Sequence, residues 1–281
     1  MVVNTADDEE FYGLHVSPDI DTVLYTLAGL APLRRGWGIA GDTFHCLAGL
    51  ERFYGRAWFR LGDRDLATHL YRTQRLRQGA SLTTITAELA RTFGVAERIL
   101  PMTDQRVRTF VRTRQHGWLP FQRYLVQHAM SADVQAIQFR GIHKAVATDA
   151  VLTAIRRATA IILPPSNPLV SLGPILRLPE VRKLLRAKRD RVVAVSPMIG
   201  ESPVKGPLDR MLYGLGHEVS PFGVARLYRD IAAVFVLDRQ DARHAARIQD
   251  LGMQPIVTDI LATRPEKARS LAERTLEALE R

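Results

Sequence analysis

The sequence predicts an α/β fold: a Rossmann-like, mostly parallel sheet with helices on both faces and a mainly helical insertion. Three observations favour it. Apolar runs alternate with amphipathic helical patterns through the second half of the chain, which is typical of parallel strands joined by crossover helices. The first half has a different, arginine-rich helical pattern. The 281 residues, 46% of them hydrophobic, can bury a large core.

The second half supplies most strands of the predicted sheet. We expect a buried strand in the apolar run at 160–165, further strands at 191–197 and 232–238, and a short strand at 254–259. Helical patterns connect and follow them at 178–190, 207–216, 240–252 and 264–281. Ligands in such sheets usually bind beyond the carboxyl ends of the strands, so the loops that follow the strands are candidate binding segments.

Residues 31–130 are interpreted as the mainly helical insertion, leaning over the binding edge of the sheet. Within it, 62–79 and 81–94 are amphipathic, and the second pattern begins with Ser81 as an N-cap and ends at Gly94. Segments 1–30 and 131–281 then form the α/β core, with strand alternation again at 134–139. The whole chain is expected to be a single domain.

Composition narrows the class of protein. A lone cysteine, Cys46, excludes an intramolecular disulfide framework, and the sequence has no leader pattern or long apolar run. We therefore expect a soluble, cytoplasmic protein without a membrane partner. The net charge of +10 is compatible with binding to nucleic acid, an anionic membrane surface or phosphate-bearing small molecules. The densest basic stretch, 181–191, lacks interleaved aromatic residues, which favours a solvated helix face over a nucleic-acid footprint.

A helix is expected to begin after Ser17, with Ser17 as N-cap and Pro18 in the first turn. Its inward stripe is Ile20, Val23, Leu24, Leu27 and Ala28. Asp19 suits the positive end of the helix dipole, so its simplest role is helix electrostatics. Asp21 lies beyond the capping positions at the margin of the stripe and is a stronger candidate for binding.

Asp7 and Asp8 follow a short apolar run and are expected just past the carboxyl end of a strand. Carboxylates gathered there provide the hard oxygen ligands that Mg²⁺ takes together with water and substrate phosphate. The alternative is a polar turn with side-chain hydrogen bonds to its own backbone. Both interpretations stay open for this pair.

Three further segments have candidate binding residues. The loop 164–176 contains Ser166 and Asn167, and the loop 196–207 contains Lys205 and Gly206. Each follows a predicted strand and offers groups for a phosphate or base edge, although ordinary turns have similar composition. Arg64 stands between two aspartates before a predicted helix; it suits an anionic or carbonyl-rich substrate, or else belongs to a cap with surface ion pairs.

Eight short segments, taken in the order in which they occur in the chain, carry a family resemblance. They read NTADD, SPDIDTVLYTLAG, RGWGIAGDTF, LGDRDLATHL, GASLT, ILPMTD, PPSNPLVSLGPIL and SPMIGESPVKGP. Together they resemble the 2-phospho-L-lactate transferase family of coenzyme F-420 biosynthesis, from residue 2 almost to the C-terminus. The resemblance implies a transferase that moves 2-phospho-L-lactate or a related phospho-three-carbon acid, such as phosphoenolpyruvate, from a guanosine-diphosphate-linked donor. The acceptor is the deazaflavin Fo, GMP is released, and Mg²⁺ is required.

The same resemblance implies roles for individual residues. Asp21 and Arg64 match positions that bind the deazaflavin. Asp7 matches the metal-binding aspartate, with Asp8 and Asp19 as neighbours, and Asp7 and Asp21 are the expected catalytic residues. The guanosine and phosphate side of the donor is expected at Ser166, Asn167, Lys205 and Gly206.

The sequence departs from the family pattern at its start. The resemblance implies a strand, a glycine-rich loop and a helix before the NTADD segment, and this sequence begins inside the strand that ends in NT. We expect the chain to be less stable than one extended upstream by that segment. A non-catalytic nucleotide or nucleotide-sugar binding regulator is the alternative function, and a homodimer is left open.

Overall fold

The computed structural model describes residues 1–32, 36–262 and 264–279, which form two compact units. The first unit comprises Met1–Phe110, Leu119–Ser131 and Gln138–Val151. The second comprises Val111–Trp118, Ala132–Ile137 and Leu152–Arg281. The single-domain organisation stays a prediction.

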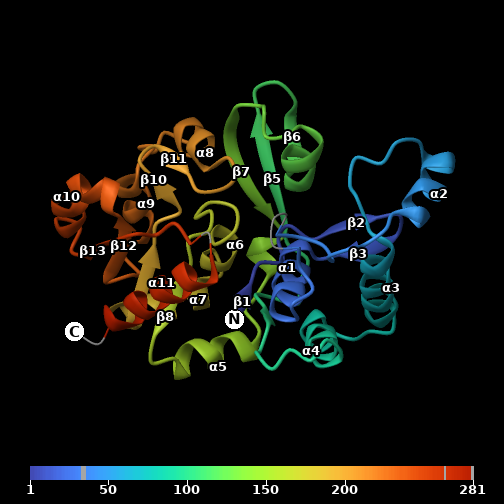
Figure 1. The fold of residues 1–281 in the computed structure, drawn as a ribbon, viewed down its shortest axis with the longest axis horizontal. Coiled ribbons are helices and arrows are strands. Elements are labelled where there is room, and N and C mark those ends of the chain that lie inside the picture. Colours follow the sequence, from blue (N-terminus) through green and yellow to red (C-terminus); the bar gives the residue numbers. More distant parts are fainter. Residues whose placement is uncertain (33–35, 263, 280–281) are drawn as a thin grey trace. The chain divides into compact units, whose positions relative to one another are not determined.

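The second unit contains the predicted parallel sheet (Figure 1). Its four strands run in the order β13 (Gln254–Thr258), β12 (Val234–Asp238), β9 (Val192–Val195) and β8 (Ile161–Leu163). All neighbours are parallel. Every residue of β9 and β12 is buried, so both faces of the central strands are covered, as their apolar runs predict.

α-Helices and short 3₁₀ helices precede, connect and follow these strands. They are α5 (Asp149–Arg157), α6 (Gly173–Leu176), α7 (Pro179–Ala187), η3 (Arg189–Arg191), α8 (Leu208–Gly214), α9 (Pro221–Tyr228), η4 (Arg239–His244), α10 (Ala245–Gln249) and α11 (Pro265–Glu277), with the hairpin β10 (Met198–Ile199) and β11 (Ser202–Pro203). α11 places Leu271 in one core cluster with Val193 and Val236 and so packs on one face of the sheet.

Two details of the second unit differ from the sequence-based expectation. β8 is an edge strand with Ile162 39% exposed, so its apolar run is not a fully buried strand. The helical pattern at 240–252 divides into the 3₁₀ helix η4 and the short helix α10. The basic helix α7 behaves as predicted: Val181 and Leu185 are buried. Its arginines Arg182 and Arg186 pair with Asp230.

The first unit begins with β1 (Val2–Val3), which pairs in parallel with β4 (Leu100–Pro101), as expected for the run that ends in NT. A hairpin follows, made of β2 (Glu9–Phe11) and β3 (Leu14–Val16). The remaining elements are α1 (Pro18–Leu27), α2 (His45–Tyr54), α3 (Asp63–Arg77), α4 (Leu82–Thr92), the π-helix η1 (Arg123–Gln127) and the 3₁₀ helix η2 (Ile142–Lys144).

A three-stranded sheet lies partly inside the segment that was expected to be mainly helical. β5 (Arg108–Thr113), β6 (Gly117–Pro120) and β7 (Val134–Arg140) form a three-stranded sheet in the order β6-β5-β7. β7 was predicted at 134–139. β4, β5 and β6 fall inside segment 31–130, where α2, α3 and α4 account for most of the regular structure; these three strands were not predicted. The buried and partly exposed residues alternate along β5, which is the strand period.

The core of the first unit forms around α1 and α4. Ile20, Leu24 and Tyr25 of α1 are fully buried in a cluster with Ile85 of α4. Leu27, predicted in the inward stripe, is 38% exposed. Tyr25 is buried in its place, because the buried face of this helix, formed by Ile20, Asp21, Leu24 and Tyr25, is rotated away from Leu27.

The helix ends explain three of the polar residues noted in the sequence. Ser81 caps α4 by accepting a hydrogen bond from the Thr84 amide, as predicted. Ser17 occupies the N-cap position of α1, but its side chain makes no capping hydrogen bond. Asp63, the aspartate before Arg64 and the residue meant in the cap interpretation of that segment, is not the N-cap of α3, since Gly62 holds that position.

Asp42 and Asp63 cap each other's helices. The Asp42 carboxylate accepts hydrogen bonds from the Arg64 and Asp65 amides at the start of α3, at 2.8 and 3.1 Å. The Asp63 carboxylate accepts from the His45 and Cys46 amides at the start of α2, both at 2.9 Å. A Cβ on Gly62 would collide with the Asp42 carboxylate, so this exchange of caps requires glycine there.

No described helix has the length and apolar character needed to cross a membrane.

Candidate active site

Asp7 and Asp8 lie just past the carboxyl end of β1, as the sequence predicts, and both are buried (5% and 2% exposed). The Asn4 side-chain amide donates to Asp7 at 3.0 Å and to Asp19 at 2.9 Å. Asn4 therefore links the strand end to the first turn of α1. Burial, reinforced by the charge of Asp19, raises the pKa of Asp7 well above its usual value, and burial raises the pKa of Asp19 to about 6.

Asp8 contacts β3 and the residue that precedes α1. Its Oδ2 atom accepts a hydrogen bond from the Ser17 hydroxyl at 3.0 Å and lies 2.9 Å from Nε2 of His15 on β3. The Ser17 hydroxyl is thus used to orient Asp8 instead of capping α1. The Oδ1 atoms of Asp7 and Asp8 are buried and have no hydrogen-bond partner among the described residues.

Both carboxylates line a pocket of about 340 Å³ within the first unit. The lining residues are Ala6, Asp7, Asp8, Glu9, Arg106, Arg108, Thr109, Phe110, Pro120, Phe121, Gln122, Arg140 and Gly141. Asp7 and Asp8, which line one pocket, each have a buried carboxylate oxygen without a partner among the described residues. Such oxygens fit a hard divalent cation, because they otherwise carry an uncompensated desolvation cost. The donor set is therefore suitable for Mg²⁺.

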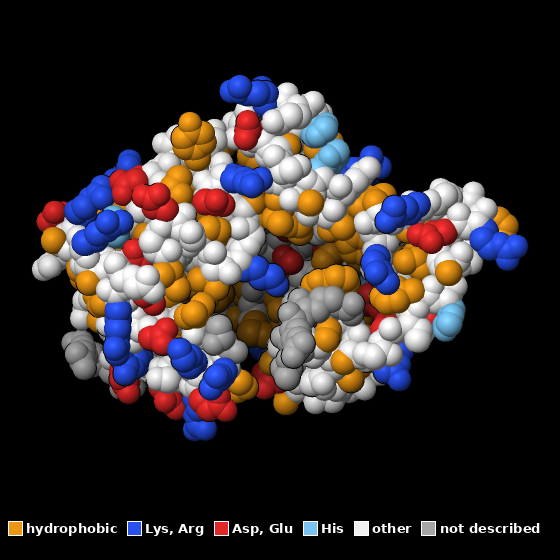
Figure 2. All heavy atoms as spheres, turned by 45° about the horizontal axis from the view of Figure 1, so that its top comes forward, with side chains coloured by type: hydrophobic (Ala, Val, Ile, Leu, Met, Phe, Trp, Pro, Cys, Tyr) orange, Lys and Arg blue, Asp and Glu red, His pale blue; other side chains and the backbone are white. Residues whose placement is uncertain are grey.

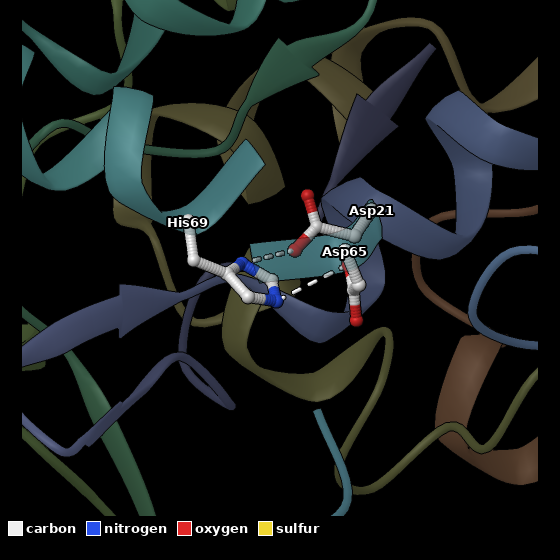
Figure 3. A group of neighbouring side chains, drawn as sticks. All are labelled: Asp21, Asp65 and His69. Atoms are coloured by element: carbon white, nitrogen blue, oxygen red, sulfur yellow. Dashed lines mark ion pairs between the residues drawn. The ribbon is translucent and has the colours of Figure 1, made fainter. Parts of the chain in front are cut away.

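Asp21, Asp65 and His69 form a second group that has metal-ligand spacing (Figure 3). His69 on α3 lies between the two carboxylates, with Nε2 3.2 Å from Asp65 and Nδ1 3.7 Å from Asp21. Arg72, which is fully buried, makes two hydrogen bonds to the Asp21 carboxylate, one of them at 3.1 Å. A guanidinium already supplies the positive charge here, so this group is better described as a buried ion-pair network than as a metal site.

Tyr25 completes this network from α1. Its hydroxyl donates to Asp65 at 2.6 Å, and burial together with the nearby carboxylates raises the pKa of the phenol above its usual value. The sequence reasoning missed Tyr25, Asp65, His69 and Arg72. A signal was present: residues 65, 69 and 72 stand at i, i+4 and i+7 and therefore share one face of α3.

The two residues that the resemblance places on the deazaflavin have contrasting surroundings. Asp21 is buried and bonded to Arg72. Arg64 is exposed near the start of α3, where its Nη1 atom lies 3.5 Å from the carbonyl oxygen of Ala40. No contact joins the two among the described residues.

The four residues expected on the donor side lie in the second unit. Ser166 and Asn167 follow β8, whereas Lys205 and Gly206 follow the β10–β11 hairpin that comes after β9. The side-chain oxygen of Asn167 accepts from the Leu169 amide at 2.9 Å and so stabilises its own loop. Ser166 is partly exposed beside it. Lys205 and Gly206 are exposed, and Gly206 has φ 78°, which glycine adopts readily.

The chain is similar to known proteins over almost its whole length. It matches the family described as 2-phospho-L-lactate transferase CofD over residues 1–276. A 2-phospho-L-lactate transferase of Methanosarcina mazei is 40% identical over 99% of this chain and 91% of its own. A phosphoenolpyruvate transferase of Kitasatospora aureofaciens is 39% identical, covering 98% and 88%. A crystal structure of a UPF0052-family protein from Bacillus halodurans superposes with a TM-score of 0.56 at 14% identity, covering 96% and 81%.

Proposed function

The chain belongs to the 2-phospho-L-lactate transferase family, and from this we propose that it transfers a phospho-three-carbon acid to the deazaflavin Fo in coenzyme F-420 biosynthesis. The donor is guanosine-diphosphate-linked 2-phospho-L-lactate or its phosphoenolpyruvate counterpart, and GMP leaves. A relative named 2-phospho-L-lactate transferase and one named phosphoenolpyruvate transferase have nearly the same sequence identity to this chain, 40% and 39%. The observation that carries the proposal is the pair of buried, partly unpartnered carboxylates of Asp7 and Asp8 at the pocket after β1.

The proposed residue roles follow the local geometry. Asp7 and Asp8 would hold Mg²⁺, and Asp19 is linked to Asp7 through the shared Asn4 amide. When bound, the ion neutralises charge on the transferring phosphoryl group. Asp7 and Asp21 act in catalysis, with Asp21 also binding the acceptor; Arg72 fixes the orientation of its carboxylate.

Arg64 provides an exposed guanidinium for the polar edge of the acceptor. On the donor side, we assign the guanosine and phosphate groups to Ser166, Asn167, Lys205 and Gly206. Support for these roles comes from exposure: Lys205 is a free cation among the described residues, and the Gly206 backbone is accessible. The chemistry is a displacement at the phosphorus that carries the three-carbon acid. The acceptor hydroxyl oxygen forms the new P–O bond, the P–O bond to GMP breaks with the bridging oxygen leaving on GMP, and the hydroxyl proton passes to solvent.

A transfer assay followed by mass spectrometry tests the proposed function. The protein is mixed with Fo, Mg²⁺ and either the lactyl or the enolpyruvyl guanosine-diphosphate donor. We expect the phospho-acid adduct of Fo together with GMP, and the preferred donor identifies the acid. Absence of product with both donors, while the protein still binds guanine nucleotide, would contradict the transferase and indicate the regulatory alternative.

A further inference from the structure

The pocket after β1 contains charges of both signs, and the roles above use only the negative ones. Arg106, Arg108 and Arg140 line it together with Asp7 and Asp8. Among the described residues no ion pair joins these arginines to these carboxylates. The opposite charges therefore remain separated across the pocket, which is an arrangement that a ligand can neutralise.

Two of these arginines are held in place but keep hydrogen-bond donors free. Nη1 of Arg108 donates to the Val107 carbonyl oxygen at 2.8 Å, while its buried Nε has no partner in the described part of the chain. Nε of Arg140 donates to Gln138 at 3.3 Å, and its guanidinium lies over the Phe110 ring at 3.6 Å from the centroid. A guanidinium has five N–H donors, so each retains donors for a ligand.

The backbone around these arginines is closely fitted. Gly141 lines the pocket with φ 89°, and a Cβ at this position would collide with the carbonyl oxygen of Arg106. Glycine thus allows the chain after β7 to approach the segment before β5. This approach places Arg106 and Arg140 on the lining of one pocket.

We propose that Arg106, Arg108 and Arg140 form the subsite for an oxyanion of the donor's three-carbon acid. The inference deepens the proposed function and rests on it. Carboxylate and phosphate groups match the planar fork of arginine donors, and a pocket of about 340 Å³ accommodates a small phospho-acid. Because Asp7 and Asp8 in the same pocket are acidic, the arginines supply the positive charge that such a group requires.

Direct binding tests the subsite separately from turnover. Calorimetry with phosphoenolpyruvate in the presence of Mg²⁺ compares the unmodified protein with Arg106→Gln and Arg140→Gln, both at exposed positions. Arg91→Gln, on the exposed face of α4, is the matched control. We expect about 10- to 100-fold weaker binding in the two pocket variants and no change in the control. Thermal melts check that all variants are folded.

Competition identifies which oxyanion the arginines bind. Inorganic phosphate displaces phosphoenolpyruvate if they hold its phosphate, and pyruvate displaces it if they hold its carboxylate. The subsite is refuted if the unmodified protein does not bind phosphoenolpyruvate at millimolar concentration, or if both pocket variants bind it as tightly as the control. Arginine-dependent binding without any transfer activity would support the subsite while contradicting the proposed function. Normal transfer with an unchanged donor KM in both variants would overturn the subsite alone.

Discussion

The side chain with the clearest structural role is Arg72, which is fully buried against Asp21. Removing one partner of a buried ion pair leaves an uncompensated charge, so we expect Arg72→Met to lower the free energy of unfolding by about 3–5 kcal/mol. Arg75→Met, three residues along the same helix, breaks the partly exposed pair with Glu88, whose side chains are 30% and 24% exposed, and should cost less stability. Urea unfolding of both variants measures the difference; equal losses would show that the burial of Arg72 is not what matters.

Divalent metal binding distinguishes the two acidic groups of the first unit. Because a ligand that binds only the folded state stabilises it, Mg²⁺ at ten times its Kd should add about 1.4 kcal/mol to the free energy of unfolding. We expect Asp7→Asn to abolish this gain and Asp65→Asn to retain it, since Arg72 already occupies the network to which Asp65 belongs. Melting curves with and without Mg²⁺ provide the test. Loss of the gain only in Asp65→Asn would move the metal to that network.

His244 gives the second unit a predictable pH dependence. Burial, then the charge of Arg243, lowers the pKa of this histidine below its ordinary value of 6.5, and neither ring nitrogen has a partner among the described residues. As the pH falls, His244 is therefore protonated in the unfolded chain before it is protonated in the folded one. The free energy of unfolding is unaffected by this residue above pH 6.5 and decreases as the pH falls below it. We expect His244→Gln to lose less stability than the unmodified protein between neutral pH and about pH 5. Parallel slopes in chemical unfolding would contradict this assignment.

At the scale of elements, the reciprocal caps connect α2 and α3. Asp42 accepts two amide hydrogen bonds at the start of α3, and replacing such a cap by alanine costs about 0.5–2 kcal/mol. We expect Asp42→Ala to reach the upper part of that range and Asp42→Asn, which keeps one acceptor, to cost less. Equilibrium unfolding measures both; a larger loss for Asp42→Asn would mean that the capping hydrogen bonds are not the cause.

The elements that could be predicted were those whose signal is local. β9, β12 and β13 follow apolar runs, and α4 has its cap at Ser81 and its stop at Gly94. β5 was missed because its arginines and threonines resemble the surrounding helical composition. The short run of β8 was predicted as a strand, but its exposure depends on its position at the sheet edge, which one strand's sequence does not contain.

In the candidate site, too, only the residues that are close together in the sequence could be predicted. Asp7 and Asp8 were predictable because a strand end and two acidic residues are adjacent in the chain. Arg72 was not, because its partner Asp21 is 51 residues away. Arg108 and Arg140 approach the same pocket only through the fold. Chemistry that depends on neighbouring residues can therefore be predicted from the sequence, whereas the counter-charges that complete it require the structure.

At the scale of the whole molecule, the basic excess is dispersed over the surface. The net charge is +10, yet Lys and Arg on the face shown in Figure 2 are interspersed with Asp and Glu and form no continuous stripe. Arg182, Arg186 and Arg247 are paired with carboxylates. A dispersed excess of this kind serves anionic small molecules better than a long phosphate backbone.

We therefore expect only weak, salt-sensitive binding to nucleic acid. Fluorescence anisotropy of a labelled DNA duplex should show association at low ionic strength that disappears near physiological salt, because few phosphates are contacted at once and each contributes to the salt dependence. The guanosine-diphosphate-linked donor, by contrast, should bind at physiological salt through a few specific contacts. If duplex binding persists at about 0.2 M salt with a slope corresponding to six or more phosphate contacts, the charge serves a nucleic-acid partner and the small-molecule interpretation of the basic residues is wrong.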